Sequence, residues 1–61
     1  MSLIYPDLPL QELYIQHQSV WEEVWAGLSS PEDALIYMQV DRDSDLWELA
    51  YAMLLSGEDP L

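Results

Sequence analysis

The chain has 61 residues, no cysteine, and a net charge of −11 at pH 7 that comes from twelve acidic residues and one base, Arg42. Without cysteine it has neither a disulfide framework nor a thiolate metal site. Contacts with phosphate groups need Lys and Arg, so the composition argues against direct binding to nucleic acid and to anionic membranes. Apolar residues make up 51% of the chain, which argues against disorder, and the length allows one small domain over residues 1–61.

The first residues predict an extended arm over Met1–Pro6, in which Leu3, Ile4 and Tyr5 pack against the helices that follow. This start lacks the basic region of a signal peptide. No segment approaches the roughly 18–20 uninterrupted apolar residues of a membrane span. We therefore expect an unprocessed, soluble and cytoplasmic protein.

A long amphipathic helix is predicted over Leu8–Leu28, with Asp7 as its N-cap and Pro9 in its first turn, where a missing N–H does no harm. The apolar residues recur at helical spacing and cover one face. They are Leu10, Leu13, Tyr14, Val20, Trp21, Val24, Trp25 and Leu28. Those on the opposite face are Glu12, Gln16, Ser19, Glu22 and Glu23. Ile15 is the apolar exception on that polar side.

A second helix is predicted to begin after Ser30, which acts as its N-cap, with Pro31 in the first position. Glu32 and Asp33 suit the positive end of the helix dipole. The segment Ala34–Val40 is apolar nearly all round and also fits a strand. The start signal favours the helix.

The segment Asp41–Asp45 is poor helix material, so the chain either breaks there or continues as one long helix with a strained middle. Ser44 or Asp45 can cap a third helix, and Asp45 with Glu48 fits a capping box. Gly57 ends that helix. The predicted fold is all-α: a small bundle of two to three short helices, as a helical hairpin or a three-helix bundle, with an extended N-terminal arm.

The third helix carries an apolar arc of about 200°, wider than one neighbouring helix covers. The arc consists of Leu46, Trp47, Leu49, Ala50, Tyr51, Met53 and Leu54. Two interpretations stay open: the helix lies at the centre of the bundle, or part of the arc contacts another chain. Trp and Tyr are enriched among interface anchors, and so small a fold has little room to bury three tryptophans.

The spacing of Asp41, Asp43 and Asp45 is that of the opening of an EF-hand calcium loop. The rest of that loop is missing, because the required Gly is replaced by Leu46 and the required bidentate Glu by Ala52. We interpret the three aspartates as loop and helix-capping residues. The sequence predicts no metal site and no cofactor.

His17 lies between Tyr14 and Trp21 on the apolar face of the first predicted helix, without the partners that a metal site requires. The preferred interpretation is a half-buried His hydrogen-bonded to a neighbouring helix, and the alternative is a pH-sensitive contact. Glu22 and Glu23 point about 100° apart, which suits a solvated surface better than acid–base chemistry. The chain has only two glycines and therefore no Gly-rich phosphate loop. We predict no catalytic residue.

The acidic residues ring the predicted helices and are almost unopposed by Lys or Arg. A basic partner surface favours such a pattern, because opposite electric fields steer association. The acids expected to contact the partner are Glu12, Glu22, Glu23, Asp41, Asp43, Asp45 and Glu48. The apolar anchors expected beside them are Trp47, Tyr51, Trp25 and Ile15.

In size and charge the chain resembles the small acidic inhibitors that phages and mobile elements direct against nucleic-acid-binding proteins, including anti-CRISPR proteins and DNA mimics. That resemblance lies in composition alone and transfers no site residue. It implies a non-enzymatic protein that inhibits or regulates a basic partner, with carboxylates in place of phosphates. The alternative is a self-associating helical adaptor or regulator, in which the third helix forms a homodimer seam.

Overall fold

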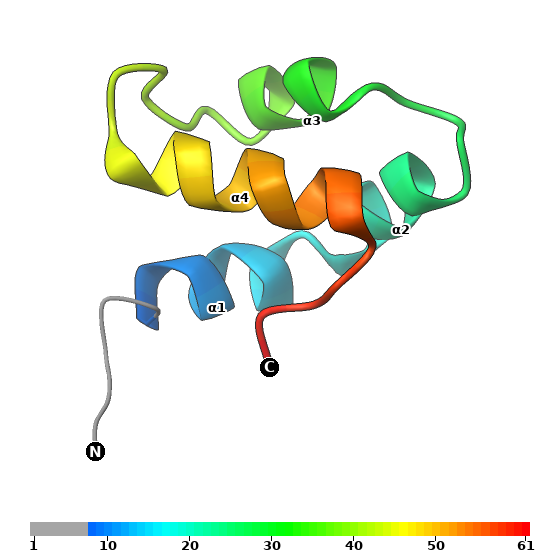
Figure 1. Cartoon of the computed structure of the whole chain (residues 1–61), viewed down its shortest axis with the longest axis horizontal. Helices are drawn as coiled ribbons and strands as arrows, with labels where there is room; N and C mark the ends of the chain where they lie inside the picture. Colours follow the sequence, from blue (N-terminus) through cyan, green and yellow to red (C-terminus); the bar gives the residue numbers. More distant parts are fainter. Residues whose placement is uncertain (1–7) are drawn as a thin grey trace.

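The computed structural model describes residues 8–61, and these residues form four helices and no β-strand. The helices are α1 Leu8–Gln16, α2 Gln18–Trp25, α3 Pro31–Tyr37 and α4 Asp45–Ser56 (Figure 1). The predicted all-α class is confirmed, whereas the predicted number of two to three helices is too low. The extended arm predicted over residues 1–6 lies outside the described residues.

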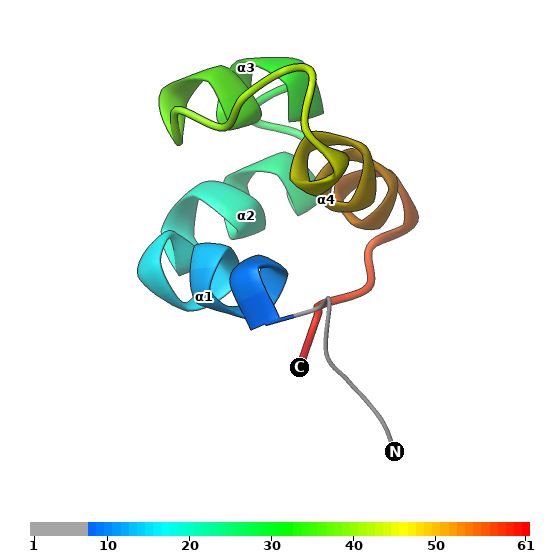
Figure 2. The same ribbon diagram turned by 90° about the vertical axis from the view of Figure 1, so that its left-hand side faces the viewer.

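The single helix predicted over residues 8–28 is wrong, because the helix is interrupted at His17. The backbone of His17 leaves the helical region, with φ −133° and ψ 39°. Its N–H donates to the carbonyls of Leu13 and Tyr14, at 3.2 Å each, and its own carbonyl accepts the N–H of Trp21 at 3.1 Å. The chain therefore changes direction between α1 and α2 while the backbone groups of His17 stay paired (Figure 2).

The size of the bundle explains this interruption. A straight helix over residues 8–28 would be about 32 Å long, whereas the 12 residues of α4 span about 18 Å. In the structure α1 packs against α4, and α2 packs against both α3 and α4. A straight helix would extend past the end of α4 and leave part of its apolar face exposed, so the bend keeps both halves on the core.

The start of α3 is as predicted, but its end is not. The Ser30 hydroxyl accepts the N–H of Asp33 at 3.1 Å, which confirms Ser30 as the N-cap. The helix ends at Tyr37 and does not reach Val40, because Gln39 adopts φ 61°. The N–H of Val40 then donates to the carbonyl of Leu35 at 3.1 Å, as in a Schellman motif.

The two helices α3 and α4 are separate, so no continuous helix runs through the segment 41–45. Of the two predicted caps Ser44 is the one used, since its hydroxyl accepts the N–H of Trp47 at 3.3 Å. The predicted capping box is wrong because Trp47, and not Glu48, occupies the third helical position. The left-handed Gly57, at φ 83°, ends α4 as predicted.

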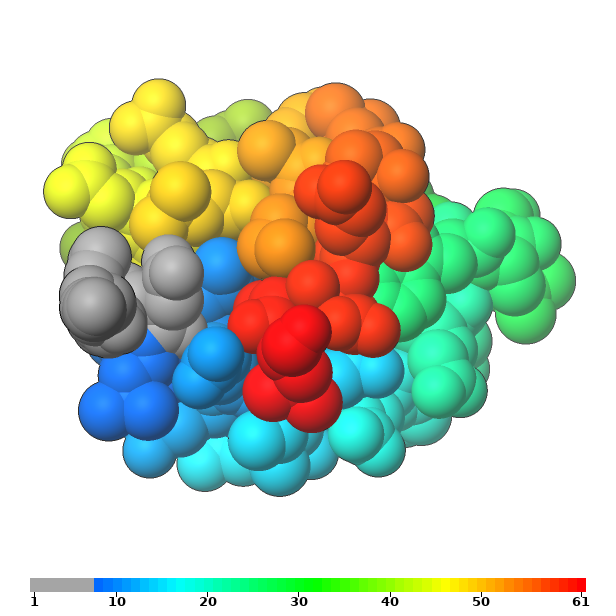
Figure 3. Space-filling model, turned by 60° about the horizontal axis from the view of Figure 1, so that its bottom comes forward, coloured from blue at the N-terminus to red at the C-terminus, as the bar shows by residue number. Residues whose placement is uncertain are grey.

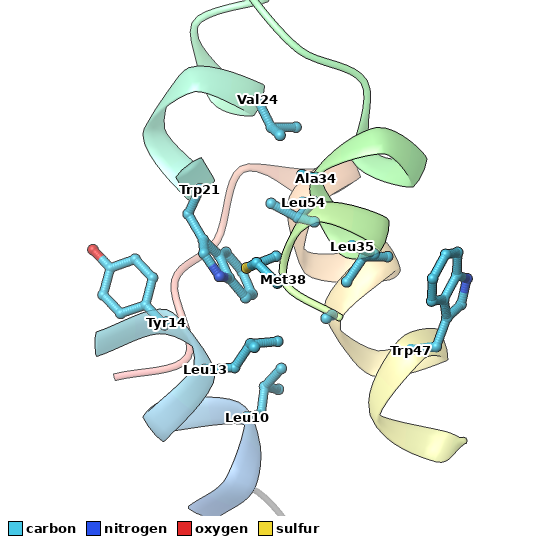
Figure 4. Packing of buried hydrophobic residues seen from close by; sticks show 11 residues of the cluster. Leu10, Leu13, Tyr14, Trp21, Val24, Ala34, Leu35, Met38, Trp47 and Leu54 are labelled. Carbon is cyan, nitrogen blue, oxygen red and sulfur yellow. The ribbon is translucent and has the colours of Figure 1, made fainter. Parts of the chain in front are cut away.

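Helix α4 packs against α1, α2 and α3, with its largest contact against α3, and α2 likewise contacts the other three helices (Figures 1 and 2). The buried core residues are Leu10, Leu13, Tyr14, Trp21, Val24, Ala34, Leu35, Met38, Trp47, Ala50 and Leu54. Trp21 and Leu35 are fully buried, and Figure 4 shows Trp21, Met38 and Leu54 pointing toward one another from different parts of the chain. Within the apolar arc of α4, Trp47, Ala50 and Leu54 are thus core residues, whereas Leu49 and Tyr51 are exposed.

Two connecting segments lie on the surface of this core. The chain after α4 returns over α1, where the side-chain amide of Gln11 donates to the carbonyl of Pro60 at 3.1 Å (Figure 3). The loop between α2 and α3 projects from the body and leaves Leu28 exposed. None of the helices in residues 8–61 has the length and hydropathy needed to cross a bilayer.

Candidate protein-binding surface

Arg42 is the only Lys or Arg of the chain, and it contacts other residues of the chain itself. Arg42 Nη2 donates to Glu32 Oε2 at 2.5 Å, and the guanidinium carbon lies 5.3 Å from the ring centre of Trp47. Because 67% of the Arg42 side chain and 46% of the Glu32 side chain are exposed, water screens the ion pair strongly. Within residues 8–61, Glu32 is the only acid in a salt bridge. The other described acids form no salt bridge in that part of the chain.

The acids predicted to contact a partner are all exposed, but they do not form one patch. Glu12 is on α1, and Glu22 and Glu23 are on α2. The remaining ones, Asp41, Asp43, Asp45 and Glu48, lie in the loop before α4 and in its first turn. In Figure 1 this loop is at the left end of the molecule, whereas α2 is toward the right. The structure therefore spreads the negative charge over several faces.

Of the three aspartates at positions 41, 43 and 45, the first two take part in hydrogen bonds of the loop. The Asp41 carboxylate accepts the N–H of Asp43 at 3.0 Å, and the Asp41 carbonyl accepts the Ser44 hydroxyl at 2.6 Å. Asp45 follows the Ser44 cap, near the positive end of the α4 dipole. In residues 8–61 no group of three or more His, Asp or Glu side chains is placed to hold a metal ion.

The outward side of α4 carries the apolar residues that the core does not use. Five residues line a shallow hollow of about 360 Å³. They are Trp47, Glu48, Tyr51, Ala52 and Leu55, which we call the α4 strip. Trp47, Tyr51 and Leu55 are spaced four residues apart and so follow one line along the helix. Tyr51 is 36% exposed and Leu55 is 65% exposed, so this line passes from the core to open surface.

The predicted apolar anchors differ in their exposure. Trp47 is a core residue, only 8% exposed, and Trp25 is half-buried with its indole N–H donating to the carbonyl of Met53 at 3.4 Å. Ile15, on the outward side of α1, is exposed, and Tyr51 is partly so. The structure thus shelters the indoles that the sequence led us to expect on the surface. Ile15 and Tyr51 remain available as anchors.

A second hollow lies between α2 and α3 and has a volume of about 440 Å³. It is lined by Ser19, Val20, Glu23, Ser29, Asp33, Ala34 and Tyr37. The structure brings Glu23 of α2 and Asp33 of α3 to the same groove, although they are ten residues apart in the sequence. Tyr37 on its rim is 71% exposed.

Tyr37 and Leu55 are surface residues that the sequence analysis did not assign to a site. Signals for both are present in the sequence. Tyr37 lies two residues after the buried Leu35, about 200° round the helix, and so points away from the core. Leu55 lies four residues after Tyr51 and therefore continues the same line on α4.

His17 has a backbone role at the junction of α1 and α2, where it is half-buried. Its carbonyl accepts the N–H groups of Val20 and Trp21, which belong to the first turn of α2. The structure therefore places His17 at a bend, and not in the middle of a continuous apolar face.

Comparison of the chain with protein-family models, with curated proteins and with solved structures found no match.

Proposed function

We propose that this chain is a non-enzymatic protein that binds a basic surface of a nucleic-acid-handling protein and thereby inhibits or regulates it. One observation carries the proposal: apart from Glu32, every acid in residues 8–61 is exposed, while the only base is bound to Glu32. The exposed charge is therefore almost purely negative on several faces at once.

Such a surface has a direct physical consequence for association. Two proteins with opposite fields attract each other over about 10 Å at moderate ionic strength, which raises the rate of productive encounter. A site that binds nucleic acid is lined by Lys and Arg that normally neutralise phosphates. Exposed carboxylates neutralise the same side chains, so the acidic chain and the nucleic acid compete for one surface.

The arrangement of the carboxylates supports binding more than catalysis. Glu22 and Glu23 are neighbours on α2 and diverge by about 100°, so they do not converge on one substrate atom. Of the two, only Glu23 lines the groove between α2 and α3. Divergent carboxylates suit a broad cationic surface.

The test is the binding of the full chain to purified nucleic-acid-binding domains of high positive charge, measured by calorimetry from about 0.05 M to about 0.5 M salt. We expect the affinity to fall steeply as salt rises, and duplex DNA to displace the chain from each domain. A neutral domain of similar size serves as the control. An affinity that barely changes with salt would show that charge mimicry is wrong.

A second candidate function, self-association through α4, is supported by the exposure of Leu49 and Leu55, at 42% and 65%. A symmetric dimer brings the same face of both copies together, so the Glu48 carboxylates of both copies would lie in one interface. Sedimentation of the chain at several concentrations tests it. A strict monomer at high concentration counts against the dimer.

A further inference from the structure

We propose that the α4 strip is the docking site for a cationic amphipathic helix of the partner. In this arrangement the partner places apolar side chains on Tyr51 and Leu55, and Lys or Arg side chains beside Glu48. The inference rests on the proposed function and adds to it the surface used and the kind of segment recognised.

The shape of the strip suits a helix. The line from Trp47 to Leu55 covers eight residue steps, or about 12 Å, which matches two turns of a facing helix. A helix that docks in a groove contacts it through apolar residues spaced three or four apart, the same spacing as this line. Trp47 is packed in the core, so its position at one end of the strip is fixed.

Three of the strip's four apolar residues, Tyr51, Ala52 and Leu55, are exposed in the described chain, whereas Trp47 is covered by the core and by the guanidinium of Arg42. Leu55 is 65% exposed although it follows the buried Leu54 directly, and Ala52 beside it is also exposed. Apolar surface gathered in one place and rimmed by polar residues is typical of an interaction site. The apolar face of the proposed partner helix would contact these residues.

The negative charge around the strip indicates which charged side chains the partner helix carries. Glu48 lies within the strip, and Asp45 is three residues earlier in the first turn of α4. Helix α4 contains no basic residue, and Arg42, the base nearest in sequence, is bound to Glu32. A partner with Lys or Arg at the edges of its apolar face pairs with these carboxylates, and an acidic or neutral helix would leave them unpaired.

The same charge argues against a second copy as the occupant. Each copy carries a net charge of −11, so a dimer joins two strongly repelling bodies. The twofold axis would also bring Glu48 of both copies to one seam. The negative field of the chain attracts a cationic segment, whereas it repels a second copy of the chain.

The experiment uses the full chain and two synthetic peptides of Leu and Lys, each about 14 residues long, which is near the shortest length for an isolated helix. One peptide has all leucines on one helical face, and the other has the same composition in scrambled order. Binding is measured by calorimetry for the unchanged chain and for Tyr51→Ser, Leu55→Ser and Ile36→Ser. Ile36→Ser is the matched control, because Ile36 is 56% exposed on α3 and does not line the strip.

We expect the amphipathic peptide to bind more tightly than the scrambled one. Tyr51→Ser and Leu55→Ser should each weaken its binding about tenfold, whereas Ile36→Ser should leave it within about twofold. Amide shifts in nuclear magnetic resonance spectra of the unchanged chain should change most over residues 45–57 on adding the peptide. This mapping needs no variant and stands even if one variant folds poorly.

Two results would overturn the docking site while leaving the proposed function in place. One is salt-dependent binding of both peptides with equal affinity, unaffected by the strip variants. The other is a set of shift changes centred on α1 or α2. If neither peptide binds even at low salt, the docking site and the proposed function both fail. A dimer of the unchanged chain that Leu55→Ser dissociates would assign the strip to self-association and would also overturn the proposal.

Discussion

The guanidinium of Arg42 lies over the indole of Trp47, 5.3 Å from the ring centre, and the same group donates a hydrogen bond to Glu32. The loop between α3 and α4 is thereby tied to both helices through one side chain. Trp47 is almost fully buried, so the guanidinium rests on the outer edge of the core. This contact is the only cation–π pair found in residues 8–61.

Arg42→Ala should lower the free energy of unfolding by roughly 1 kcal/mol, because an exposed cation–π contact and a largely screened ion pair are lost together. The stability of Arg42→Lys should lie between that of Arg42→Ala and that of the unchanged chain. Lys keeps the charge beside Glu32 but lacks the planar guanidinium that covers Trp47. Urea denaturation measures both variants. An Arg42→Ala variant as stable as the unchanged chain would mean that the stacking contributes nothing.

Replacing the helix caps should destabilise the fold by about 1 kcal/mol each. Ser30→Ala removes the acceptor for the N–H of Asp33, and Ser44→Ala removes the acceptor for the N–H of Trp47. The loss should be larger for Ser44→Ala, because its hydroxyl also donates to the carbonyl of Asp41. Urea midpoints measure the difference between the two variants. Equal losses would contradict the additional role of the Ser44 hydroxyl.

Trp21→Phe should destabilise the chain much less than Trp21→Ala. Trp21 is fully buried, and its indole N–H has no hydrogen-bond partner in residues 8–61. Truncation to Ala opens a cavity that typically costs about 3–5 kcal/mol, which is enough to unfold a marginal domain. Phe keeps most of the packing against Tyr14 and removes the unpaired N–H, which itself costs about 1–3 kcal/mol when buried. Circular dichroism during thermal unfolding separates the two variants. Similar losses for both would indicate that the indole N–H has a partner in solution.

Gln39→Gly should stabilise the chain by about 0.5–1 kcal/mol. Gln39 has φ 61°, a left-handed conformation that glycine adopts without the steric cost of a Cβ. Gln16→Gly is the matched control, since Gln16 is the last residue of helix α1 and its replacement by glycine should lower the free energy of unfolding by at most about 1 kcal/mol. Thermal melting of both variants tests the sign. A Gln39→Gly variant that melts below the unchanged chain would contradict the left-handed turn after α3.

Local signals in the sequence determined the helical class and several helix ends. The caps at Ser30 and Ser44 and the stop at Gly57 each depend on one side chain or one backbone angle within a few residues. The acidic surface was equally predictable, because charged side chains stay in water unless they are paired. Neither feature needs contacts between distant parts of the chain.

Only the tertiary structure decided the bend at His17 and the exposure of the aromatic residues. The apolar residues before and after His17 keep the same helical phase, so periodicity predicts one helix there, while packing on the short helix α4 requires two. The apolar arc of α4 likewise shows which residues avoid water but not which neighbours cover them. Helix α4 packs against three other helices, and their positions decide that Trp47 is buried while Leu55 is exposed.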